Sequence, residues 1–207
     1  FDFAASFNGL SELRQELPPP PAGLDALYKE GSRLRERDQV DVLKDLYWNA
    51  RHKWDRGEFA DFLGRVWRLR EAALYREVGR LCGGTLEKNG AALKQWIEGD
   101  PQADLKKYLA EQRLEIELNN RVLQCCLEYF AKHGGGLNSE EMGRVTKTYE
   151  ATRFFEKASA LRNNSIIAHG YEGLSREKIL HALGVPGASE TMFERLGDLL
   201  EALGVNV

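Results

Sequence analysis

The chain has 207 residues, a formal net charge of −3 and three cysteines. This length suits one domain with its own hydrophobic core, and the slightly acidic balance excludes a protein that coats nucleic acid, so any nucleic-acid contact must be local. The number of cysteines is odd, and two of them, Cys125 and Cys126, are adjacent and cannot form an ordinary disulfide with each other. With Cys82 as the third, this pattern favours a reducing, cytoplasmic setting. The sequence contains no run of about twenty apolar residues that could span a membrane.

Residues 1–38 are expected to hold an N-terminal helix, a proline-rich spacer and a lead-in helix. Four consecutive prolines, Pro18 to Pro21, cannot continue a helix and favour an extended connector. This connector is either a spacer after a missing upstream domain or a strap on the surface of a helical bundle. Because the chain opens on Phe1 rather than Met, we expect it to be a fragment whose upstream part is missing.

Residues 39–207 have helical periodicity almost throughout and no convincing alternating strand, which predicts an all-α bundle. The first two helices should form an antiparallel pair, because a tight connection around Gly57 separates their apolar stripes. Trp48, Trp67 and Trp96 are interpreted as core residues. The apolar stripes predict helices at about 43–57, 59–83, 86–98, 101–108 and 114–134.

The next helix has the sharpest start signal in the chain. Asn138 and Glu141 are spaced as a capping box, with Leu137 and Met142 placed as a hydrophobic staple. From there one long helix is expected to run through Arg162 to about His169. Two shorter helices, opening near Ser175 and Ser189, should finish the chain.

The end of this long helix carries the chemical motif. Arg162 and His169 fit the pattern of Arg, four to six residues and His, and so do Arg176 and His181. At about 100° per residue, Arg162 and His169 return to nearly the same helix face, whereas Arg176 and His181 point about 140° apart. Only the first pair can converge on one substrate atom.

The residue types of this pair suit the cleavage of RNA. A histidine takes or returns a proton near neutral pH, and an arginine braces phosphate oxygens as charge builds up in the transition state. Asn163 could hydrogen-bond the phosphate or orient a catalytic side chain. No cluster of His, Asp, Glu or Cys has the spacing of metal ligands. The alternative is structural, since a histidine in a last helical turn also stabilises the helix dipole.

The same face of the long helix continues backwards from the motif through small residues and one aromatic, which would allow another helix to approach closely. If that helix came from a second copy of the chain, two-fold symmetry would gather two arginines and two histidines in one cleft. The face comprises Arg144, Ala151, Phe155, Ala158, Arg162, Ser165 and His169.

At this motif the chain resembles the HEPN ribonucleases, whose Arg-x(4–6)-His signature frequently has Asn after the Arg. Three upstream segments, 45–51 (DLYWNAR), 57–59 (GEF) and 65–68 (RVWR), are similar to paired helices of the ancillary ribonucleases of type III CRISPR systems. The resemblance covers roughly residues 40–175.

The resemblance implies an all-α, HEPN-type helical bundle over residues 39–207, with additional short helices. It implies a homodimer with a composite, metal-independent site that needs no cofactor, cleaves single-stranded RNA and spares DNA, in antiviral defence. Arg162 and His169 would be catalytic and Asn163 supporting, with the roles of base and phosphate clamp left open. Cyclic oligoadenylate would bind only to a CARF sensor domain upstream. The rival function is a non-catalytic HEPN module that binds a nucleotide or a partner and dimerises.

Overall fold

The computed structural model describes residues 39–84, 86, 90–99, 102–158, 161, 163 and 173–206. The described residues form helices and connecting turns and no strand, so the predicted all-α fold is confirmed for them. The helices are α3 (Gln39–Asp55), α4 (Phe59–Leu81), α5 (Ala91–Glu98), α6 (Ala103–Glu111), α7 (Asn120–His133), α8 (Ser139–Glu156), α10 (Arg176–Leu183) and α11 (Ser189–Ala202).

The chain divides into two units, Phe1–Asp45 and Leu46–Val207. Residues 39–45 begin α3 and are the described part of the first unit. The expected organisation of residues 1–38 lies outside the described residues and stays a prediction.

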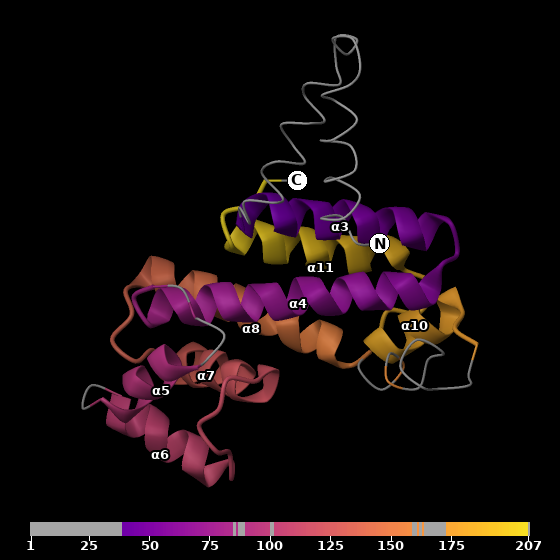
Figure 1. Cartoon of the computed structure of the whole chain (residues 1–207). Coiled ribbons are helices and arrows are strands. Elements are labelled where there is room, and N and C mark those ends of the chain that lie inside the picture. The colour runs from indigo at the N-terminus through magenta and orange to yellow at the C-terminus, as the bar shows by residue number, and fades with distance from the viewer. Residues whose placement is uncertain are drawn as a thin grey trace, which may run out of the picture. The chain divides into compact units, whose positions relative to one another are not determined.

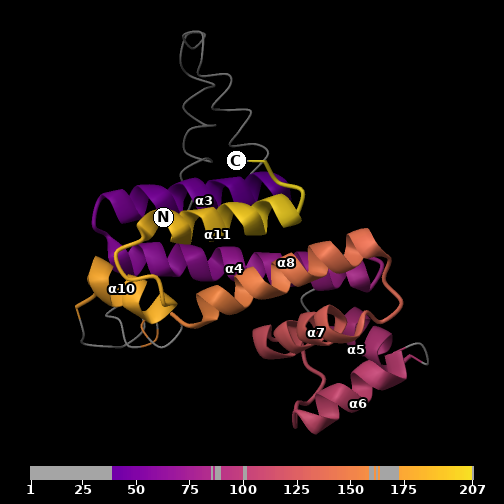
Figure 2. The same cartoon turned by 180° about the vertical axis from the view of Figure 1, so that it is seen from behind.

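Helix α8 is the central element of the second unit. It packs against α4, α7 and α11, and α5 and α6 lie on the side of α7 (Figures 1 and 2). One hydrophobic core cluster lies where α4 to α8 meet, and it includes Leu74, Leu93, Leu105, Leu123 and Val145, none of which is exposed. Each such buried aliphatic side chain contributes about 1.5–3 kcal/mol to folding.

A second apolar contact joins three aromatic rings from α3, α4 and α11. The ring centroids of Trp54 and Phe62 lie 4.9 Å apart, and that of Phe193 lies 6.1 Å from Trp54 and 6.2 Å from Phe62. Tilted and edge-on aromatic contacts of this kind add to the burial of the rings. They fix the C-terminal part of α3 and the last helix to the start of α4.

The start of α7 and the burial of Trp48 were predicted wrongly. Helix α7 begins at Asn120 rather than near Leu114, because the Asn119 side chain caps it by accepting hydrogen bonds from the backbone amides of Arg121 and Val122. Trp48 is not a core residue: 53% of its surface is exposed, since the neighbouring Tyr47 occupies the buried side of α3.

Candidate functional site

Of the three predicted site residues, the structure describes Asn163. It is exposed and has helical conformation, as has Leu161. Arg162 and His169 lie outside the described residues, so their convergence on one face stays a prediction.

The start of the helix that leads to the motif is confirmed. The Asn138 Oδ1 accepts from the backbone N–H of Glu141 at 2.9 Å, and the Glu141 carboxylate accepts from the backbone N–H of Asn138 at 3.0 Å. These two reciprocal bonds satisfy amides that have no partner within the helix. The capping box therefore fixes where α8 begins.

The predicted end of that helix was wrong. Helix α8 ends at Glu156, and Lys157 and Ala158 form a turn. One helix does not run without a break from Asn138 to the motif, so the face of residues 139–156 cannot be extended to Arg162 by counting residues.

The helix face expected to receive a second copy is covered by the chain itself. Ala151, Phe155 and Ala158 are 4%, 2% and 3% exposed, because α8 packs among three other helices. Arg144, on the same predicted face, donates from Nε to the fully buried carboxylate of Glu77 at 2.8 Å. This part of the face is therefore not the surface for a partner helix.

A groove of about 760 Å³ lies between Leu161 and α10. It is lined by Leu161, the residue before Arg162, and by the exposed side chains of Arg176, Lys178 and His181 on α10. The Arg176 guanidinium lies 5.2 Å from the centre of the Trp54 ring, a cation–π contact that fixes its position. The groove therefore gathers the side chains of Arg176, Lys178 and His181 around Leu161, together with the carboxylate of Glu177.

The second Arg and His that fit the motif pattern, Arg176 and His181, both lie exposed on α10. Helix geometry separates them by about 140°, so they do not converge as a catalytic pair. Their place in the groove beside Leu161 was missed. The sequence did contain a signal for this groove, because α10 carries several basic side chains only a few residues after the motif.

Among the described residues, no group of three or more His, Cys, Asp or Glu side chains is placed to hold a metal ion. Within the same residues, none of the helices has both the length and the apolar character needed to cross a membrane.

The profile of the Csm6 HEPN domain family matches residues 32–184, a range that includes α3 to α8 and the whole motif from Arg162 to His169. The chain belongs to this family. It is a HEPN domain of the kind found in CRISPR-associated ribonucleases, as the resemblance implied. Comparison with curated proteins and with solved structures gave no match.

Proposed function

We propose that this HEPN domain is an endoribonuclease that cleaves single-stranded RNA through Arg162 and His169, with Asn163 in support, in CRISPR-linked antiviral defence. The observation that carries the proposal is that the family match spans the complete Arg-Asn-x(5)-His motif. The groove beside Leu161 adds support, because Arg176 and Lys178 would attract the phosphates of a bound strand.

The reaction needs no group beyond the RNA and the side chains of the domain. The ribose 2′-hydroxyl attacks the adjacent phosphorus, and the bond from phosphorus to the 5′-oxygen of the next nucleotide breaks. A proton leaves the 2′-oxygen and one is delivered to the departing 5′-oxygen. The products are a 2′,3′-cyclic phosphate and a free 5′-hydroxyl.

His169 is suited to move one of these protons, and Arg162 to hold the two non-bridging phosphate oxygens as their charge rises. Asn163 is exposed and could donate to the phosphate. We propose that a second copy of the chain completes the site. Regulation by cyclic oligoadenylate at an upstream CARF domain stays a prediction.

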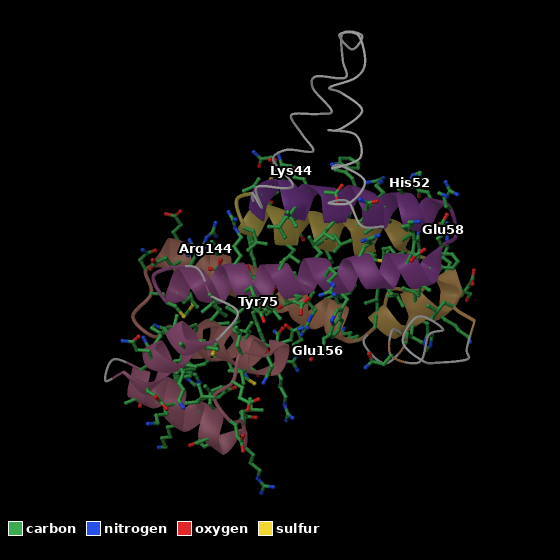
Figure 3. All side chains as sticks on the ribbon, viewed as in Figure 1. Lys44, His52, Glu58, Tyr75, Arg144 and Glu156 are labelled. Atoms are coloured by element: carbon green, nitrogen blue, oxygen red, sulfur yellow. The ribbon has the colours of Figure 1, made fainter. Side chains whose placement is uncertain are left out.

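The test is cleavage of a labelled single-stranded RNA by the full chain in excess chelator. We expect 2′,3′-cyclic phosphate ends, and we expect His169→Ala to lower the rate by about 10²–10⁴-fold. The matched control is His52→Ala, which removes an exposed histidine on α3 and should leave the rate unchanged (His52 is labelled in Figure 3).

Three results would contradict the proposal. Loss of cleavage in chelator would contradict the metal-free reaction, and equal rates for His169→Ala and the wild type would contradict the role of His169. Cleavage of a DNA strand of the same sequence at a similar rate would contradict attack by the 2′-hydroxyl. A chain that binds RNA or a nucleotide without cleaving it would be the non-catalytic module.

A further inference from the structure

A buried arginine organises the region where α4, α7 and α8 meet. Arg70 is 2% exposed, and its Nε donates to the backbone carbonyl of Thr152 at 2.9 Å. Its Nη2 donates to Gln124 Oε1 at 3.0 Å and lies 3.5 Å from Glu156 Oε1. Gln124 and Glu156 are therefore held side by side by the same nitrogen atom, and Figure 3 shows Glu156 near the end of α8.

This contact fixes the orientation of the Gln124 amide. An arginine has only donors, so the amide oxygen must face Arg70 and the NH2 group must face away from it. Gln124 is 7% exposed, and its Nε2 is buried without a hydrogen-bond partner among the described residues. A buried donor without an acceptor costs about 1–3 kcal/mol, so an acceptor is expected beside it.

Gln124 also lines a cavity of about 260 Å³ between α7 and α8, and a group bound there would supply that acceptor. Gln124 lines it together with two carboxylates, Glu128 and Glu156, and two guanidinium groups, Arg121 and Arg153. Cys125 and Tyr149 complete the lining, so the cavity has anionic acceptors and cations in one place.

The Glu128 carboxylate is an acceptor at neutral pH. Burial raises the pKa of Glu128, but the hydrogen bond from Lys132 and the charges of Lys132 and Arg153 outweigh burial and hold this pKa below its ordinary value. Glu156 is 49% exposed and lies beside the buried charge of Arg70. A ligand there must offer N–H donors to a carboxylate and a carbonyl to the Gln124 amide.

We propose that this cavity binds a guanine base. The guanine O6 would accept from Gln124 Nε2, and its neighbouring N1–H and N2–H groups would donate to the Glu156 carboxylate, which lies next to Gln124. Arg121 and Arg153 would hold the phosphate attached to the nucleoside. That the guanine belongs to the RNA substrate rests on the proposed ribonuclease function.

The other bases fit this set of groups less well. Guanine presents two adjacent N–H donors beside a carbonyl, whereas adenine has no carbonyl and uracil has one ring N–H. Cytosine has a carbonyl but no ring N–H donor. Single-stranded RNA exposes these edges to side chains, so base-edge hydrogen bonds can select the nucleotide.

The test is equilibrium dialysis of the full chain against guanosine, inosine, adenosine and uridine 5′-monophosphates. We expect guanosine monophosphate to bind best and inosine monophosphate, which lacks the 2-amino group, to bind more weakly. Gln124→Glu keeps an oxygen towards Arg70 but replaces the donor with an acceptor, and should weaken guanosine monophosphate binding by about tenfold or more. Gln95→Glu makes the same change on the exposed face of α5 and should not alter binding.

Glu156→Gln provides a second variant at a half-exposed position, in case Gln124→Glu does not fold, and should also weaken binding by about tenfold. Equal binding of all four nucleotides, best binding of adenosine monophosphate, or no binding at all would overturn the proposal, the last leaving an ordered water as the acceptor. So would a folded Gln124→Glu protein that binds as tightly as the wild type. Because dialysis requires no cleavage, its failure would leave the proposed ribonuclease function standing.

Discussion

Glu77 is a fully buried carboxylate that joins α4 to α8. It accepts from Arg80 Nη1 at 3.2 Å and from Arg144 Nε at 2.8 Å, and these two guanidinium groups are partly exposed. The two cations offset the cost of burying the carboxylate, and the Arg144 contact ties the first turns of α8 to α4. No sequence pattern indicated this role, since the three residues come from two helices far apart in the chain.

We therefore expect Glu77→Gln to lower the free energy of unfolding by about 2–4 kcal/mol, because two arginines lose their anionic partner. Urea unfolding measures the difference. The matched control, Glu150→Gln on the exposed side of α8, should change the free energy of unfolding by no more than about 0.5 kcal/mol. If Glu77→Gln lowers the free energy of unfolding by no more than the control does, the Glu77 contacts contribute nothing to stability.

The three cysteines are free thiols. Burial raises the pKa of the Cys82 thiol to about 12, and the pKa of the fully buried Cys126 thiol is raised as well. The thiolate is the reactive form, and a raised pKa leaves little of it at pH 8. Cys126 of the native protein should then react with iodoacetamide at least about a hundredfold more slowly than in urea. Mass spectrometry at timed intervals gives both rates, and rapid native alkylation of Cys126 would contradict the prediction.

At the scale of whole elements, helix boundaries set by contacts between nearby residues could be predicted, and boundaries set by tertiary packing could not. The start of α8 could be predicted because the capping box is a contact between residues three apart. The end of α8 at Glu156 could not, because no proline or glycine marks it. The start of α7 was placed too early because Leu114 and Leu118 continue its apolar spacing outside the helix, where they still pack against the core.

The capping box gives a prediction for α8 as a unit. Asn138→Ala removes the side chain that accepts from the Glu141 amide and should cost about 1 kcal/mol of the free energy of unfolding. Glu150→Ala, in the middle of the same helix and exposed, serves as the control and should change it by less than about 0.5 kcal/mol. If the cap variant unfolds at the same urea concentration as the control, the box does not stabilise the helix.

At the scale of the molecule, the all-α fold and the family could be predicted because helical periodicity extends along the chain and the motif has a fixed spacing. The surface that would bind a second copy of the chain could not be predicted. A stripe of small residues on a helix looks the same whether it meets a partner or the chain's own helices, and here Ala151 and Ala158 are buried within the chain. Likewise Trp48 and Tyr47 are neighbours in sequence, and packing alone decides which of them is buried.

If a second copy completes the catalytic site, activity must depend on association. We expect the cleavage rate per chain to fall when the protein is diluted below its dimer dissociation constant, because each separated chain holds half of the site. Light scattering and cleavage assays over the same concentrations test this. If the rate per chain stays constant at concentrations where light scattering shows only monomers, the catalytic site is contained in one chain.

The central position of α8 has a mechanical consequence. This helix is clamped by α4, α7 and α11, and it ends at the turn of Lys157 and Ala158, shortly before the motif. Its backbone amides can exchange with solvent only when much of the bundle opens, whereas an isolated helix would fray from its end. The helix that precedes the motif in the sequence is therefore one that three other helices hold in place.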